Sequence, residues 1–101
     1  MEQRDKISSL LHTLPVKDVV FQPSESVKLK YPCILYDFNG YKDFFGNDGR
    51  HIVRERYTVK HIYKDPTENL RTTIRGLFVY VDFDRPFISD NLYHDVYTVY
   101  M

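Results

Sequence analysis

Two acidic residues close together near the C-terminal end are the first residues in the sequence that could do chemistry. Asp82 and Asp84 stand two positions apart in a run that we predict to be a strand, residues 77–84. In a strand both side chains would point to the same face, about 7 Å apart, as a metal site or an acid–base pair requires. Arg85 follows directly, however, and a solvated strand end beside an arginine explains the pair without catalysis.

The histidines and the cysteine show no spacing typical of a site. His12, His51, His61 and His94 include no pair three or four residues apart, so zinc ligation would need a chance convergence, and we expect surface or half-buried histidines. Cys33 lies in an apolar run, where cysteine behaves as a small hydrophobic residue. The glycines form no phosphate-binding loop. We therefore expect a protein that is not an enzyme and uses no metal or cofactor.

A row of cations on one predicted strand, residues 51–64, is the most distinctive polar feature. Arg54, Arg56, Lys60 and Lys64 occupy even positions and would all project from one side. The other side of the strand is apolar and consists of Val53, Tyr57, Val59 and Tyr63. The cations could line a channel for DNA or pair with acidic groups of a neighbouring molecule, and a plain solvated face is the alternative.

Three aromatic residues stand in the segment 39–50, which asparagine and glycine turn signals bracket. We predict a long hairpin tip here, in which Tyr41, Phe44 and Phe45 have no core to enter. Exposed aromatic side chains are typical of interfaces. We expect these three to pack on a neighbouring subunit or on a partner.

Two helices are predicted from apolar spacing and capping signals. Residues 2–14 carry the i, i+3, i+4, i+7 stripe of an amphipathic helix. A second helix is expected to open at Asp65 as the cap, with Pro66 in the first position and Glu68 completing a capping box. Leu70, Ile74 and Leu77 would face the core, and Gly76 would end this helix.

Strands are predicted at residues 18–21, 31–38, 51–64, 77–84 and 92–100, the last two joined by a loop at 85–91. This order predicts a single α+β domain over residues 1–101. We expect a two-layer sandwich, in which two helices cover one face of a mainly antiparallel sheet of about four strands.

Composition limits the classes of protein further. Fourteen basic and fourteen acidic residues give a formal net charge of zero, which argues against a dedicated nucleic-acid binder and favours self-association. A single cysteine excludes an intramolecular disulfide. We expect no membrane span, because no apolar stretch approaches the roughly 20 residues that one needs, and no signal peptide, because the N-terminus lacks an apolar h-region.

Three segments, taken in order, resemble the small neck proteins of long-tailed bacteriophages, the tail-completion and tail-terminator proteins. The segments are VFQP at 20–23 with KYPCILY at 30–36, then RYTV at 56–59 with YKDP at 63–66, and finally FDR at 83–85, SDNL at 89–92, His94 and VYTVY at 96–100. Together they span roughly residues 18–101.

The resemblance implies a structural virion protein that forms a ring, commonly a hexamer, at the head-proximal end of the tail tube. Such a ring caps the tube, meets the head connector or head-closure protein, and lets DNA pass without sequence recognition. It would be assembled in the host cytoplasm and remain in the neck of the virion. A related role as a head-closure or connector adaptor is an alternative within the same class.

Candidate contact residues follow from these observations together. At subunit or partner interfaces we expect Tyr41, Phe44, Phe45, Arg54, Arg56, Asp82 and Asp84, and we expect Lys60 and Lys64 to face a DNA channel. The complementary acidic surface would consist of Asp82, Asp84, Asp90 and Asp95. We favour pairing between subunits for the arginines, because closing a ring of small subunits is the stronger physical need.

A module that binds single-stranded RNA is the alternative from another class. Tyr57, Tyr80 and Tyr97 would then stack on bases from the face of a sheet. The neutral net charge speaks against it.

Overall fold

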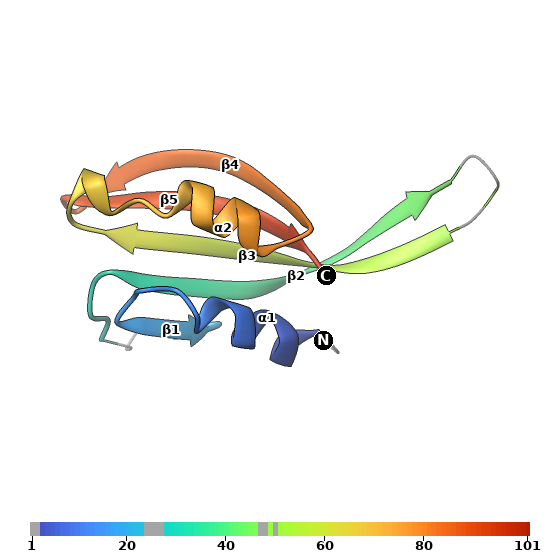
Figure 1. Ribbon diagram of the computed structural model, residues 1–101, viewed down its shortest axis with the longest axis horizontal. Coiled ribbons are helices and arrows are strands. Elements are labelled where there is room, and N and C mark those ends of the chain that lie inside the picture. Colours follow the sequence, from blue (N-terminus) through green and yellow to red (C-terminus); the bar gives the residue numbers. More distant parts are fainter. Residues whose placement is uncertain (1–2, 24–27, 47–48, 50) are drawn as a thin grey trace.

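A five-stranded sheet with both helices packed against one face forms the fold (Figure 1). The computed structural model describes residues 3–23, 28–46, 49 and 51–101. The elements are α1 (Arg4–Leu11), β1 (Asp18–Phe21), β2 (Cys33–Phe45), β3 (His51–Tyr63), the 3-10 helix η1 (Pro66–Glu68), α2 (Arg71–Leu77), β4 (Tyr80–Ser89) and β5 (Leu92–Tyr100). The strand order is β1-β2-β3-β5-β4, and only β1 pairs in parallel. The predicted α+β class with a mainly antiparallel sheet is confirmed.

The core lies between the two helices and the sheet, and the odd-numbered residues of β3 from position 55 on point into it. Tyr57 and Val59 are fully buried and pair with Val99 and Tyr97 of β5. Ile7 and Leu11 of α1 and Ile74 of α2 belong to the same buried cluster. Burying such a side chain stabilises a fold by about 1.5–3 kcal/mol, so the alternation read from the sequence of β3 fixes which face the helices cover.

The second helix is interrupted, contrary to prediction. Asp65 does cap, since its carboxylate accepts hydrogen bonds from the backbone N–H (2.9 Å) and hydroxyl (2.8 Å) of Thr67. Only the short η1 follows, because Asn69 is extended and its side chain bonds to the backbone on both sides. Such bonds compete with helix formation. The helix resumes at Arg71, and Gly76 lies inside its last turn rather than after it.

Strand β4 runs through the predicted loop 85–91. It continues to Ser89, and a two-residue turn at Asp90 and Asn91, with φ values of 54° and 62°, leads into β5. Both residues tolerate this left-handed conformation, which a tight hairpin needs. Pro86 is accommodated because β4 is an edge strand.

The β2–β3 hairpin projects far beyond the core, so residues 39–45 of the predicted tip belong to strand β2, while positions 47, 48 and 50 of that tip lie outside the described residues. Pairing continues to Phe45 opposite His51. One extra residue in β2 between Phe38 and Tyr41 forms a bulge, where Gly40 has a φ of 102° that favours glycine. Beyond the bulge, residues 41–45 of β2 and 51–54 of β3 form what we call the arm.

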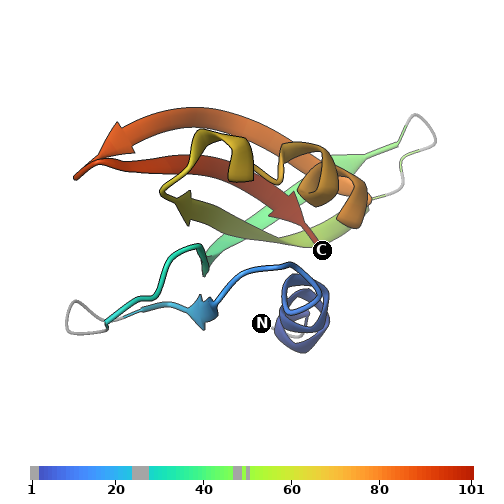
Figure 2. The same ribbon diagram turned by 60° about the vertical axis from the view of Figure 1, so that its left-hand side comes forward.

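The arm gives the molecule its elongated shape, seen in both orientations of the ribbon (Figures 1 and 2). The chain measures 48 × 26 × 23 Å, with a radius of gyration of 14.4 Å. A compact domain of this length has a radius of gyration of about 13 Å. The arm therefore places apolar residues away from the core of their own subunit.

Candidate functional site

The sheet face opposite the helices carries the predicted charged residues. We call it the open face, because among the described residues no helix or strand covers it. In the strand register, Arg56 of β3 pairs with Tyr100 of β5, which pairs in turn with Tyr80 of β4. In the same way Thr58 pairs with Thr98, which pairs with Asp82. The basic strand β3 and Asp82 on β4 thus share one face, separated by β5 and by about 10 Å.

The four predicted cations do not form one cluster. The Arg54 guanidinium lies 4.5 Å from the centre of the Tyr80 ring. Arg56 donates from Nε (3.2 Å) and Nη2 (2.9 Å) to the carbonyl of Asn39 and so holds the bulge. Lys60 lies half-buried in the middle of the open face. The prediction that Lys64 belongs to the same strand is wrong, because β3 ends at Tyr63.

Lys64, the fourth predicted cation, lies at the other end of the sheet from Arg54. The Lys64 ammonium is 5.9 Å from the centre of the Tyr31 ring. Ten residues of nearly extended chain separate it from Arg54, which corresponds to about 33 Å. Of the four predicted cations, Arg54, Arg56 and Lys60 therefore share the open face, and we call these three the basic stripe; Lys42, which pairs with Arg54 in the strand register, lies on the same face.

The two aspartates lie on the edge strand β4. Asp82 is exposed and stands opposite Thr98. Asp84 occupies a second bulge, between Phe83 and Arg85, and accepts a hydrogen bond from the Thr98 hydroxyl (2.7 Å). Within the described part of the chain, neither aspartate forms an ion pair. Their carboxylates are free to meet a partner's cations.

The three predicted interface aromatics have different environments. Tyr41 is 57% exposed and Phe45 is 75% exposed. Phe44 instead lies half-buried, its ring centre 6.1 Å from that of Tyr80 and 5.9 Å from that of Tyr100. Tyr41 and Phe45 therefore lie outside the core as expected, Tyr41 packed on Phe38 (ring centres 5.4 Å apart) and Phe45 stacked on His51 (4.7 Å), whereas Phe44 is partly covered. Their contact with a partner stays a prediction.

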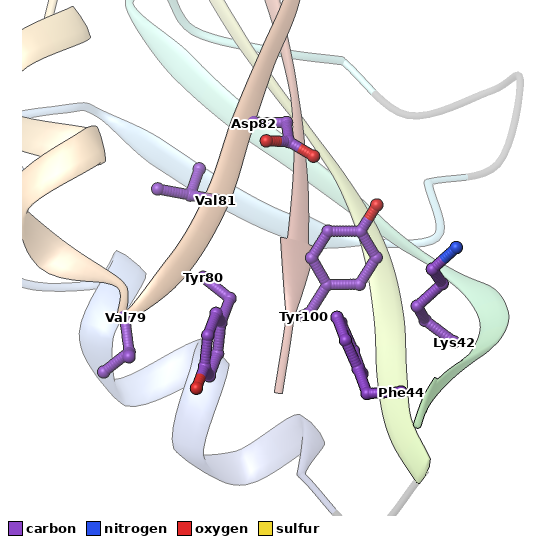
Figure 3. A pocket seen from close by; sticks show the side chains of 7 residues that line it. All are labelled: Lys42, Phe44, Val79, Tyr80, Val81, Asp82 and Tyr100. Atoms are coloured by element: carbon purple, nitrogen blue, oxygen red, sulfur yellow. The ribbon is translucent and has the colours of Figure 1, made fainter. Parts of the chain in front are cut away.

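Phe44 borders a groove between the base of the arm and β4 (Figure 3). The groove has a volume of about 420 Å³ and is lined by Lys42, Phe44, Val79, Tyr80, Val81, Asp82 and Tyr100. Figure 3 shows Lys42 and Asp82 as the charged groups among these aromatic and aliphatic walls. The groove therefore brings a predicted aromatic and a predicted acidic contact residue to one place.

A buried ionic cluster lies on the helix side of the sheet, where sequence reasoning did not find it. Asp95 is fully buried and accepts hydrogen bonds from the Tyr63 hydroxyl (2.8 Å) and from Arg71 Nε and Nη2 (3.1 Å each). The expectation that Asp95 contributes to an acidic surface is wrong. The signal was its odd position in β5, which it shares with the core residues Tyr97 and Val99.

His61 is buried beside this cluster, contrary to the expectation of surface or half-buried histidines. It stands opposite Asp95 in the sheet and stacks on Tyr63 with ring centres 4.5 Å apart, and neither of its ring nitrogens has a hydrogen-bond partner among the described residues. Burial lowers the pKa of His61 to about 4, although the charge of Asp95 acts in the opposite direction. His61 is therefore neutral at pH 7.

Several chemical interpretations find no geometry to support them. Tyr57 and Tyr97, expected to stack on RNA bases, are fully buried in the core. Cys33 is buried, and burial, with a smaller effect of Asp18, raises the pKa of its thiol to about 11, so the reactive thiolate is disfavoured. Across the described residues, no three His, Cys, Asp or Glu side chains could hold a metal ion, and neither helix could span a membrane.

Comparison of the chain with family models, with curated proteins and with solved structures finds no match.

Proposed function

We propose that the protein is a structural subunit of the neck of a tailed phage, which assembles into a ring that caps the tail tube and joins it to the head connector. The resemblance of its three sequence segments to tail-completion and tail-terminator proteins supports this role. The observation that carries it is the arm, because an apolar projection from an otherwise compact subunit serves assembly rather than folding.

Two exposed apolar surfaces support self-assembly. The arm exposes Tyr41, Phe45, Ile52 and Val53 on neighbouring strand positions, and the region of β4 exposes Val79 and Tyr80 at its start and Phe87 and Ile88 near its end. Exposed apolar side chains grouped as they are on the arm mark interaction sites in soluble proteins. The free outer edge of β4 is a further surface on which another chain can pack.

The basic stripe and the acidic edge strand support a ring with DNA passing through it. Arg54, Arg56 and Lys60 could face the axis of the ring, or pair with Asp82 and Asp84 of the next subunit. Reversing Arg54 to Glu separates the two roles. If Arg54 pairs between subunits, the change blocks assembly and an added Asp82→Lys change partly restores it. If Arg54 lines a channel, rings form and DNA passage is impaired.

Reconstruction of the neck in tails that contain the protein tests the proposal as a whole. Tails are the right sample because the tail tube could template the ring. We expect a closed ring at the head-proximal end of the tube, most simply of six subunits with a combined mass of about 73 kDa, six times 12.1 kDa. Only one or two copies in each neck would contradict it.

A further inference from the structure

A second groove lies at the end of the molecule opposite the arm. Tyr63, Arg71, Pro86, Phe87, Ile88, Tyr93 and Asp95 line it, and its volume is about 440 Å³. We call it the end groove. In Figure 1 it belongs to the left end of the sheet, where β3 and β4 finish and β5 begins, whereas the arm extends to the right. One end of the long axis thus carries an apolar projection and the other a largely apolar hollow.

The side of the arm that carries its exposed aromatics has a chemistry complementary to the end groove. Tyr41, Asp43 and Phe45 alternate along β2 and share one side, with the acidic residue between two exposed aromatics. The Asp43 carboxylate is solvent-accessible and bonds to His51 Nε2 (2.7 Å). The arm therefore presents two rings flanking a negative charge.

The end groove presents rings and one guanidinium. Tyr63 and Tyr93 stack with their centres 5.6 Å apart, and Ile88 is 66% exposed. Arg71 is bound to Asp95 through Nε and Nη2, but its side chain is 45% exposed. A guanidinium has five N–H donors, so Arg71 can bind a second carboxylate without leaving Asp95.

We infer that the arm of one subunit docks in the end groove of the next, with Phe45 against Ile88 and Tyr93 and with Asp43 beside Arg71. This deepens the proposed function and rests on it, since it names the contact that joins the ring. Because the two surfaces differ and lie at opposite ends of the subunit, the contact is head-to-tail, the type that generates a ring when the rotation closes and an open filament when it does not. An arm-to-arm pair would instead leave both end grooves empty and place two Asp43 carboxylates together.

Disulfide trapping between two singly substituted proteins tests the contact. Phe45→Cys and Ile88→Cys both change exposed side chains, and the native Cys33 is buried. When the two full-length variants are mixed in equal amounts with tails that lack the protein and are then oxidised, we expect the heterodimer to exceed either homodimer at least tenfold. Val79→Cys is the matched control, since Val79 is 89% exposed and lies just before β4, away from the end groove. It should form no such excess with Phe45→Cys.

A charge change tests the polar part of the contact in the same assay. Asp43→Arg, added to Phe45→Cys, should lower the heterodimer yield about tenfold, whereas Asp5→Arg on the surface of α1 should leave it unchanged. A heterodimer no more abundant than the homodimers, or a predominant Phe45–Phe45 product, would overturn the inference.

The outcomes also separate this inference from the ring proposal. Rings seen in tails without preferential trapping would refute the arm–groove contact alone. Preferential trapping in open chains, with no ring in tails, would support the contact and contradict the proposed function.

Discussion

Replacing His61 by leucine should remove much of the stability that the protein loses in mild acid. Burial lowers the pKa of His61 to about 4, against an ordinary value of 6.5. Between these two values the unfolded chain binds a proton at this residue and the folded chain does not. The stability that depends on neutral His61 is therefore complete above pH 6.5 and is lost as the pH falls towards 4.

The size of the effect follows from the gap between the two pKa values. One pKa unit corresponds to about 1.4 kcal/mol, so the full loss in the free energy of unfolding is about 3 kcal/mol. At pH 5 it is already about 2 kcal/mol. At pH 7 the leucine variant should lie within about 1 kcal/mol of the wild type, because removing two unsatisfied ring nitrogens offsets the lost stacking on Tyr63.

Urea unfolding followed by circular dichroism at pH 7, 6 and 5 measures this difference. The wild type should lose about 2 kcal/mol more than His61→Leu between pH 7 and 5. His94→Leu is the control, since His94 is half-buried on the open face against Phe87, and this variant should keep the acid sensitivity of His61. If the wild type and His61→Leu lost the same unfolding free energy between pH 7 and 5, the reasoning would be refuted. It would mean that His61 takes up its proton in the folded state without cost.

Three further predictions test the rest of the structure. Asp95→Asn should lower the free energy of unfolding by about 2 kcal/mol in urea, because it removes the negative charge that the Arg71 guanidinium and the buried Tyr63 hydroxyl bind. Gly40→Ala should destabilise the protein by about 1–2 kcal/mol, because alanine tolerates the positive φ of the bulge poorly. Gly76 lies in a helix with open space around it, so Gly76→Ala should stabilise the protein by about 0.5–1 kcal/mol. Equal effects of the two changes in thermal melts would contradict the positive φ at Gly40. Phe44→Ser should lower Tm by about 5 °C or more, because it removes a ring packed on Tyr100. Phe45→Ser should leave Tm nearly unchanged and block tail completion. If the Phe45→Ser variant unfolds instead, Phe45 belongs to the core.

The sequence predicts the layers of this fold well, because burial imposes a period on each strand. The alternation in β3 identifies the core face through Tyr57 and Val59, and it places Arg56 and Lys60 on the open face. The cap at Asp65 is also predictable, since it depends only on neighbouring residues.

What the sequence does not reveal depends on contacts between distant residues. Asn39 and Gly40 look like the start of a turn, but pairing with β3 converts them into a bulge from which the arm extends. Pro86 looks like a loop residue until β4 is known to be an edge strand. Asp95 and His61 occupy core-facing positions in their strands, but the sequence does not reveal the groups that bind the Asp95 carboxylate there, Arg71 of α2 and Tyr63 of β3.

The arm also changes the role that we favour for the basic stripe. From the sequence alone, pairing of Arg54 and Arg56 with Asp82 and Asp84 is the polar contact that could close a ring. Arm–groove docking would supply a closing contact built from the helix side of the sheet, since Tyr41, Phe45 and the end-groove residues Tyr63 and Asp95 all lie on that side. The open face would then stay uncovered in the assembled ring.

An uncovered open face is suited to the lumen of the ring. It would present Arg54, Arg56 and Lys60 on β3 and Asp82 and Asp84 on β4, two strands about 10 Å apart with β5 between them. The acidic strand would weaken the long-range attraction of the cations for DNA without cancelling it. Weak attraction would suit a channel, because tight phosphate binding would hold DNA that has to slide through. If the arm–groove contact joins the ring, it therefore favours the lumen over subunit bridging as the place of the basic stripe.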